Sequence, residues 1–142
     1  MRNYLHILLG VGAFSLFSAS TAAREIPASQ AAQIAQSFNR TSSATARRVQ
    51  SNVQPVLVHV ETDTNGQNLF YVFNRPGRGY IIVSADDKAR DVLAYSDSQE
   101  ITDYALVPDN MKNFLHDYAT QIIAMRSNPS ARAPKKFARE AV

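Results

Sequence analysis

The strongest restriction on the fold comes from four short apolar runs between residues 56 and 95. They are rich in β-branched and aromatic side chains, which favour strands, and they span residues 56–60, 69–73, 80–83 and 92–95. The first connection contains Asn65-Gly66, a pair that accepts positive φ and is typical of hairpin turns. Parallel neighbours need crossovers of about a dozen residues or more, so these short connections predict a small antiparallel meander.

Two amphipathic segments flank the runs and are expected to cover the sheet, several of whose strands are apolar on both faces. The first helix is predicted to begin around Pro27 and to fade near Asn39, before a polar connector at 41–52. Its apolar stripe consists of Ala31, Ile34, Ala35 and Phe38. The second helix is predicted from Pro108 to about Ser127. Its stripe consists of Met111, Phe114, Leu115, Tyr118, Ile122 and Met125. The sequence therefore predicts a two-layer α+β domain, in which a meander packs with an N-terminal and a long C-terminal helix.

The first residues have the pattern of an export signal. Arg2 supplies a positive charge, residues 4–17 are mostly apolar, and small residues precede a cleavage site before Arg24. The alternative is a membrane anchor, but the run is shorter than the roughly 20 apolar residues that span a bilayer. We expect residues 1–23 to be a signal peptide that is removed. The mature protein is then exported, periplasmic or secreted, with no stable membrane insertion.

The positive charge of the mature chain is concentrated at its end. Residues 126–142 hold five basic side chains against one acidic, whereas residues 24–125 hold nine against eleven. We expect residues 24–127 to form one domain and residues 128–142 a basic, flexible tail. The tail has a single aromatic residue, Phe137, and no repeat, so nucleic-acid binding is not expected. Cysteine is absent, which excludes disulfides and a thiolate nucleophile.

The titratable residues form no recognisable catalytic or metal-binding pattern, so no catalytic residue, metal or cofactor is predicted. His59 lies in a strand run and His116 on the C-terminal helix, and no nucleophile motif accompanies them. Asp86 and Asp87 could bind a cation. After a strand, however, such residues more often accept backbone N–H bonds within a turn. Taken alone, the residues indicate an exported, non-catalytic α+β module.

Three segments carry a resemblance to a known family. They read Asn-Leu-Phe-Tyr-Val-Phe-Asn at 68–74, Gly-Tyr-Ile-Ile-Val-Ser-Ala-Asp-Asp at 79–87 and Val-Leu-Ala-Tyr-Ser-Asp at 92–97. This block is similar to the propeptides of streptopain-type cysteine proteases and to the free-standing Spi-type inhibitors related to them. The helical segments also resemble the family, so the likeness covers about residues 25–125.

The resemblance implies a compact α+β domain that keeps a papain-fold protease latent by docking beside its active-site cleft. It implies one partner chain and no cofactor. Asn110 matches the prodomain asparagine that reaches toward the cleft, and Pro108 and Asp109 adjoin it, so these three are the expected protease-contact residues. Without the resemblance, Asn110 is equally compatible with a helix-start residue that has no partner.

No protease follows this domain in the sequence. We therefore expect a non-enzymatic, exported inhibitor that acts in trans on a streptopain-like cysteine protease from the same organism. Two alternatives stay open. One is a non-inhibitory secreted interaction module, and the other is the prodomain of a truncated proprotease.

Overall fold

A four-stranded antiparallel sheet lies at the centre of the computed structural model, which describes residues 23–38, 53–128 and 130–131. Its strands are β1 (Val56–Thr62), β2 (Asn68–Asn74), β3 (Tyr80–Ser84) and β4 (Val92–Tyr95). They pair in sequence order, β1-β2-β3-β4. The predicted antiparallel meander is confirmed.

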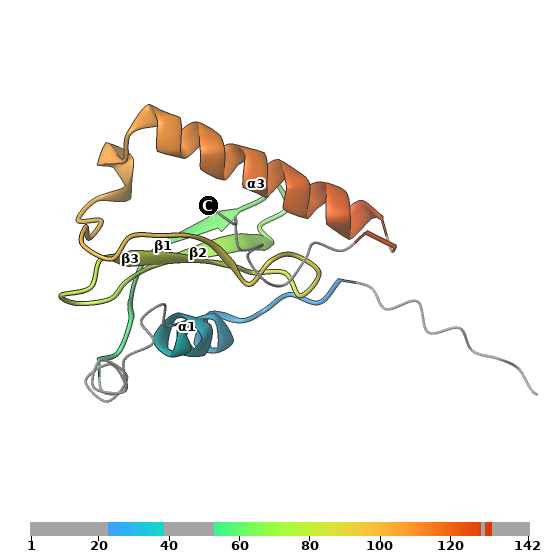
Figure 1. Cartoon of the computed structure of the whole chain (residues 1–142). Coiled ribbons are helices and arrows are strands. Elements are labelled where there is room, and N and C mark those ends of the chain that lie inside the picture. Colours follow the sequence, from blue (N-terminus) through green and yellow to red (C-terminus); the bar gives the residue numbers. More distant parts are fainter. Residues whose placement is uncertain (1–22, 39–52, 129, 132–142) are drawn as a thin grey trace, which may run out of the picture.

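Two helices cover opposite faces of this sheet. In Figure 1, α1 (Ala28–Ser37) lies below the sheet and α3 (Asp109–Ser127) lies above it. A short 3-10 helix, η1 (Tyr104–Leu106), leads into α3. The α+β class and both predicted helices are confirmed. The domain has three layers, however, and not the two that were expected, because β2 and β3 carry apolar side chains on both faces.

The sheet therefore separates two cores. The core under α3 contains Phe70, Val72, Ile82, Leu93, Leu115 and Ile122 among others. The core over α1 contains Ala31, Ala35, Tyr71, Phe73, Ile81 and Val83 among others. Alternate residues of β2 and β3 enter the two cores, as expected from the period of two in a strand. All the aromatic residues of β2 are buried, which confirms them as core.

The turns and helix starts differ in detail from the prediction. Of Asn65 and Gly66, only the glycine has positive φ, at 78°. The turn is instead closed by Asp63, whose carboxylate accepts the backbone N–H groups of Asn65 and Gln67. Pro27 and Pro108 are the N-cap residues, so the two helices begin one residue after them, at Ala28 and Asp109.

Some predicted segments lie outside the described residues. These are the connector at 41–52, the signal peptide apart from Ala23, and most of the tail. Within the part of the chain that the structure describes, no helix has the length and apolarity needed to cross a bilayer.

Candidate functional site

The three predicted contact residues lie together at the start of α3, and all are exposed. Pro108 is the N-cap, with its carbonyl oxygen 3.0 Å from the backbone N of both Met111 and Lys112. Asp109 occupies the first turn, and its side chain is 97% exposed. A carboxylate at this position is favoured by the positive end of the helix dipole.

Asn110 directs a polar amide group toward solvent. Its Oδ1 accepts a hydrogen bond from the backbone N–H of Met111 at 2.9 Å. Among the described residues, no group accepts a hydrogen bond from its Nδ2. An exposed amide donor on a helix start is free to bond a partner's carbonyl or carboxylate oxygen.

A fourth exposed residue adjoins these three and was not predicted. Leu106, the last residue of η1, is 77% exposed and is the most exposed large apolar side chain of the described residues. Its exposure could not be found from sequence, because one leucine in an irregular segment has no periodicity that marks a face. We refer to Leu106, Pro108, Asp109 and Asn110 together as the α3 tip.

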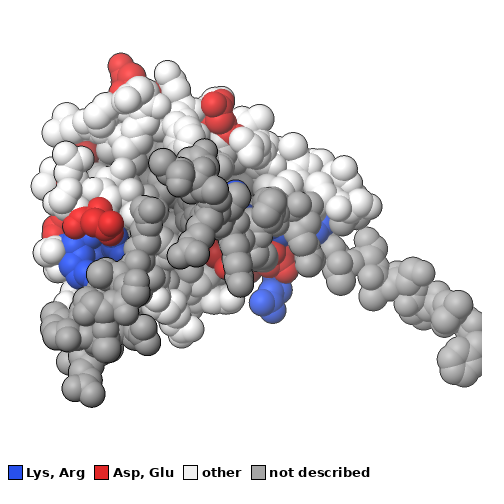
Figure 2. All heavy atoms as spheres, viewed as in Figure 1, with Lys and Arg blue, Asp and Glu red and all other residues white. Residues whose placement is uncertain are grey.

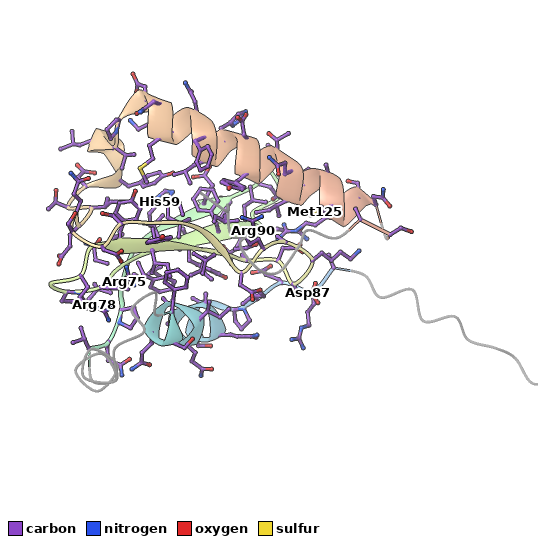
Figure 3. The ribbon with its side chains drawn as sticks, viewed as in Figure 1. His59, Arg75, Arg78, Asp87, Arg90 and Met125 are labelled. Atoms are coloured by element: carbon purple, nitrogen blue, oxygen red, sulfur yellow. The ribbon has the colours of Figure 1, made fainter. Side chains whose placement is uncertain are left out.

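The α3 tip is supported from below by an aromatic stack. The ring of Tyr104 in η1 lies on that of His59 in β1, with centroids 3.5 Å apart and planes 10° from parallel. The Nε2 of His59 donates a hydrogen bond to Glu61 at 2.9 Å. Figure 3 shows His59 on the α3 side of the sheet.

A bulge in β1 explains why His59 faces this way. Leu57 pairs with Phe73, but His59, two residues on, pairs with Val72, the neighbour of Phe73. One extra residue in β1 reverses the side-chain alternation. His59 therefore shares the sheet face of Val72, which belongs to the core under α3. The sequence identified His59 as a strand residue but gave no sign of the bulge.

Burial and the nearby Glu61 carboxylate raise the pKa of Tyr104 to about 12. The Tyr104 hydroxyl therefore stays protonated throughout the neutral range, so the stack carries no phenolate charge there. The neutral ring can pack closely against the sheet.

Two further groups fix the backbone that leads to the α3 tip. The Nζ of Lys112 donates to the carbonyl oxygen of Ala105 at 2.8 Å, which ties η1 to α3. Asn74, the last residue of β2, bonds both the N–H and the carbonyl oxygen of Ile101, at 2.9 and 2.8 Å. The loop that presents the tip is thus attached to both the sheet and the helix.

The opposite end of α3 is held by a buried ion pair. The Nε of Arg126 donates to Asp86 at 2.8 Å, and the Asp86 side chain is fully buried. The other Asp86 oxygen accepts the backbone N–H of Lys88, and Asp87 accepts the backbone N–H of Arg24. The predicted turn role is confirmed for Asp86, whereas Asp87 bonds the segment before α1 rather than its own turn, and the pairing with Arg126 was not foreseen.

Among the described residues, no three His, Asp or Glu side chains gather where they could hold a metal ion. His116 is exposed on α3 as predicted.

A groove of about 310 Å³ runs between α3 and β4, lined mostly by apolar side chains, with Arg90 and Met125 on its walls (Figure 3).

Comparison with known proteins identifies the family of this domain. The family model described as Spi protease inhibitor matches residues 23–122, which include the sheet, the α3 tip and most of α3. The chain belongs to the Spi protease inhibitor family. The matched domain is therefore of the protease-inhibitor or propeptide-like type. Membership in an inhibitor family also favours a non-enzymatic protein.

A curated relative supports this assignment over a shorter segment. The thiol protease/hemagglutinin PrtT of Porphyromonas gingivalis is 36% identical over 58 residues, which are 40% of this chain. This chain spans only 7% of the length of that relative. No solved structure gives a significant match.

Proposed function

We propose that this Spi-family protein is an exported inhibitor that binds a streptopain-like, papain-fold cysteine protease from the same organism. In this proposal the α3 tip docks at the active-site cleft and blocks it in trans. Family membership carries the proposal, and the exposed amide of Asn110 supports the choice of contact site.

The chemistry of the α3 tip suits such a cleft. A protease cleft binds peptide amides, so it offers hydrogen-bond donors and acceptors to its substrate. The side chain of Asn110 is itself an amide and can use its Nδ2 without losing any bond within the described residues.

The test is a titration of the protease with the purified protein, followed by hydrolysis of a peptide substrate. We expect activity to fall stoichiometrically. Asn110→Ala should weaken inhibition by about tenfold or more, as expected for a central polar contact. Asn128→Ala is the matched control, because Asn128 is an exposed asparagine at the other end of α3 and should leave inhibition unchanged.

Each other outcome has a defined meaning. Inhibition that survives Asn110→Ala would keep the function and reject this residue as a contact. A folded protein that leaves the protease fully active at micromolar excess would favour the non-inhibitory interaction module. The likeness to a thiol protease keeps a prodomain role as the second candidate, which faster refolding of the denatured protease in the presence of this protein would support.

A further inference from the structure

Leu106, the most exposed large apolar side chain of the described residues, lies within the α3 tip. Four other large apolar residues are partly exposed: Val56, Leu57, Phe114 and Ile123. The next most exposed of them reaches 53%, against 77% for Leu106. A single surface leucine needs no special explanation, so its exposure alone is not an argument for binding. The ordered turn that carries Leu106 and the polar groups beside it are the features that indicate binding.

Leu106 projects from a turn that is already ordered. The preceding Tyr104 is stacked on His59, and the following Val107 is only 6% exposed. The side chain of Asp103 accepts the backbone N–H of Ala105 at 2.8 Å, and Lys112 holds the carbonyl oxygen of the same residue. A side chain on such a turn loses little backbone freedom on binding, so more of its interaction energy appears as affinity.

Leu106 also stands beside groups of a different character. Asp109 and Asn110 present a carboxylate and an amide from the adjoining helix start. Elsewhere on the face shown in Figure 2, the surface over α3 carries few charged side chains. An apolar side chain next to a few polar groups is complementary to a ligand pocket, which is typically apolar with a small number of polar groups that fix orientation.

We infer that Leu106 is the apolar anchor of the protease contact and that it fills an apolar subsite of the protease cleft next to the groups bound by Asn110. The inference rests on the proposed function, which names the partner. It adds the residue that supplies apolar burial and the chemical character of the pocket that receives it.

The test measures affinity and inhibition separately. Affinity is measured for a protease whose nucleophilic cysteine is replaced by alanine, and inhibition for the active enzyme. Burial of one leucine side chain predicts that Leu106→Ala binds about tenfold or more weakly. Leu106→Asp should bind about a hundredfold or more weakly, because it also places a charge in an apolar pocket. Leu106→Met, which nearly conserves volume, should stay within about threefold of the original.

Ile123→Asp provides the matched control, since Ile123 is an exposed apolar residue near the other end of α3. It should bind as tightly as the unchanged protein. Circular dichroism and urea midpoints establish that each variant is folded, which the exposure of both positions leads us to expect.

The failures of the two proposals are distinguishable. Tight binding by both Leu106→Ala and Leu106→Asp would overturn the anchor and leave the inhibitor function intact. Absence of binding and inhibition by the unchanged protein would overturn both. Weak binding by Leu106→Ala together with full binding by Asn110→Ala would support the anchor and remove Asn110 from the contact.

Discussion

Gly79 shows how tightly a single position can be constrained in this fold. Its φ is +76°, and a Cβ at this position would overlap the carbonyl group of Ser96, which follows β4. Gly77, in the same turn, has a similar φ of +71° but open space around it. The two glycines therefore separate the cost of positive φ from the cost of the overlap.

We expect Gly77→Ala to lower the free energy of unfolding by about 1 kcal/mol, the cost of a left-handed backbone for an L-residue. Gly79→Ala should lower it by about 3 kcal/mol or more, because backbone atoms must also move. Urea denaturation of both variants gives the comparison. Equal losses would mean that the turn shifts freely and that the overlap imposes no constraint.

Arg75, next to this turn, illustrates what a sequence hides. The sequence reads 75–79 as a simple turn, yet Arg75 is buried, and its guanidinium donates to the carbonyl oxygens of Arg78 and Ser96. Burial lowers the pKa of the group, with the charge of Arg78 acting in the same direction. Figure 3 shows Arg75 and Arg78 at the same end of the sheet. The turn sequence does not mark this arginine for burial, because one of its two carbonyl partners, Ser96, lies 21 residues further along the chain.

Among the secondary structure elements, α3 is attached at its C-terminal end by the ion pair of Arg126 with Asp86. The Arg126 side chain is 16% exposed, and it also donates to the backbone carbonyl of Asn68. We expect Arg126→Met to cost about 3 kcal/mol of unfolding free energy, since it leaves the Asp86 carboxylate buried without its partner. Combining it with Asp86→Asn should recover part of that loss.

A double-mutant cycle in urea checks this prediction, with Asp86→Asn alone as the fourth member. Losses that simply add would show that the two side chains do not depend on each other. The far end of the helix provides a second readout, because detachment near Arg126 need not disturb the α3 tip. The free energy of protease binding should therefore change by less than the free energy of unfolding.

The elements themselves were largely predictable from sequence, whereas their arrangement was only partly so. The strands and α3 follow from apolar periodicity, which is a local property. The continuously apolar pattern of β2 and β3 shows that both faces of the sheet must be covered, but it does not show which helix covers which face. Phe114 was expected in the apolar stripe, yet it is half exposed and packs edge-on against Tyr118.

The candidate site divides in the same way. The resemblance to a family pointed to Asn110, and the structure adds that its amide is exposed. The position of Leu106 depends on η1, and η1 is held by the stack of Tyr104 on His59. These two rings come from segments more than forty residues apart. Such contacts leave no trace in a single sequence, because neither partner alone has an unusual local pattern.

On the scale of the whole molecule, three partly or fully buried tyrosines contribute to the response of stability to alkaline pH. Burial raises the pKa of Tyr71 and Tyr80 above the ordinary value, and that of Tyr104 to about 12. Below about pH 10, both folded and unfolded chains hold these protons, so the tyrosines leave stability independent of pH. Above that pH, the unfolded chain releases protons that the folded chain keeps, and stability falls as pH rises toward 12.

Tyr104→Phe should make this fall shallower by up to about 1 kcal/mol per pH unit. The full effect of one group is about 1.4 kcal/mol per pH unit, and partial exposure of the ring reduces it. Urea unfolding at a series of pH values from about 9 to 11 measures the slope. Parallel slopes for the two proteins would contradict the assignment of Tyr104 as a contributor.

The length of α3 has a consequence for proteolysis. Its 19 residues make a rod of about 28 Å between the α3 tip and Ser127. A catalytic centre occupied by the tip is therefore separated by that distance from the peptide bonds that follow the helix. An enzyme bound as proposed would therefore not reach the peptide bonds just beyond the last turn of α3. Trimming at that junction needs a second enzyme molecule, so the rate would depend on how many uninhibited molecules are present.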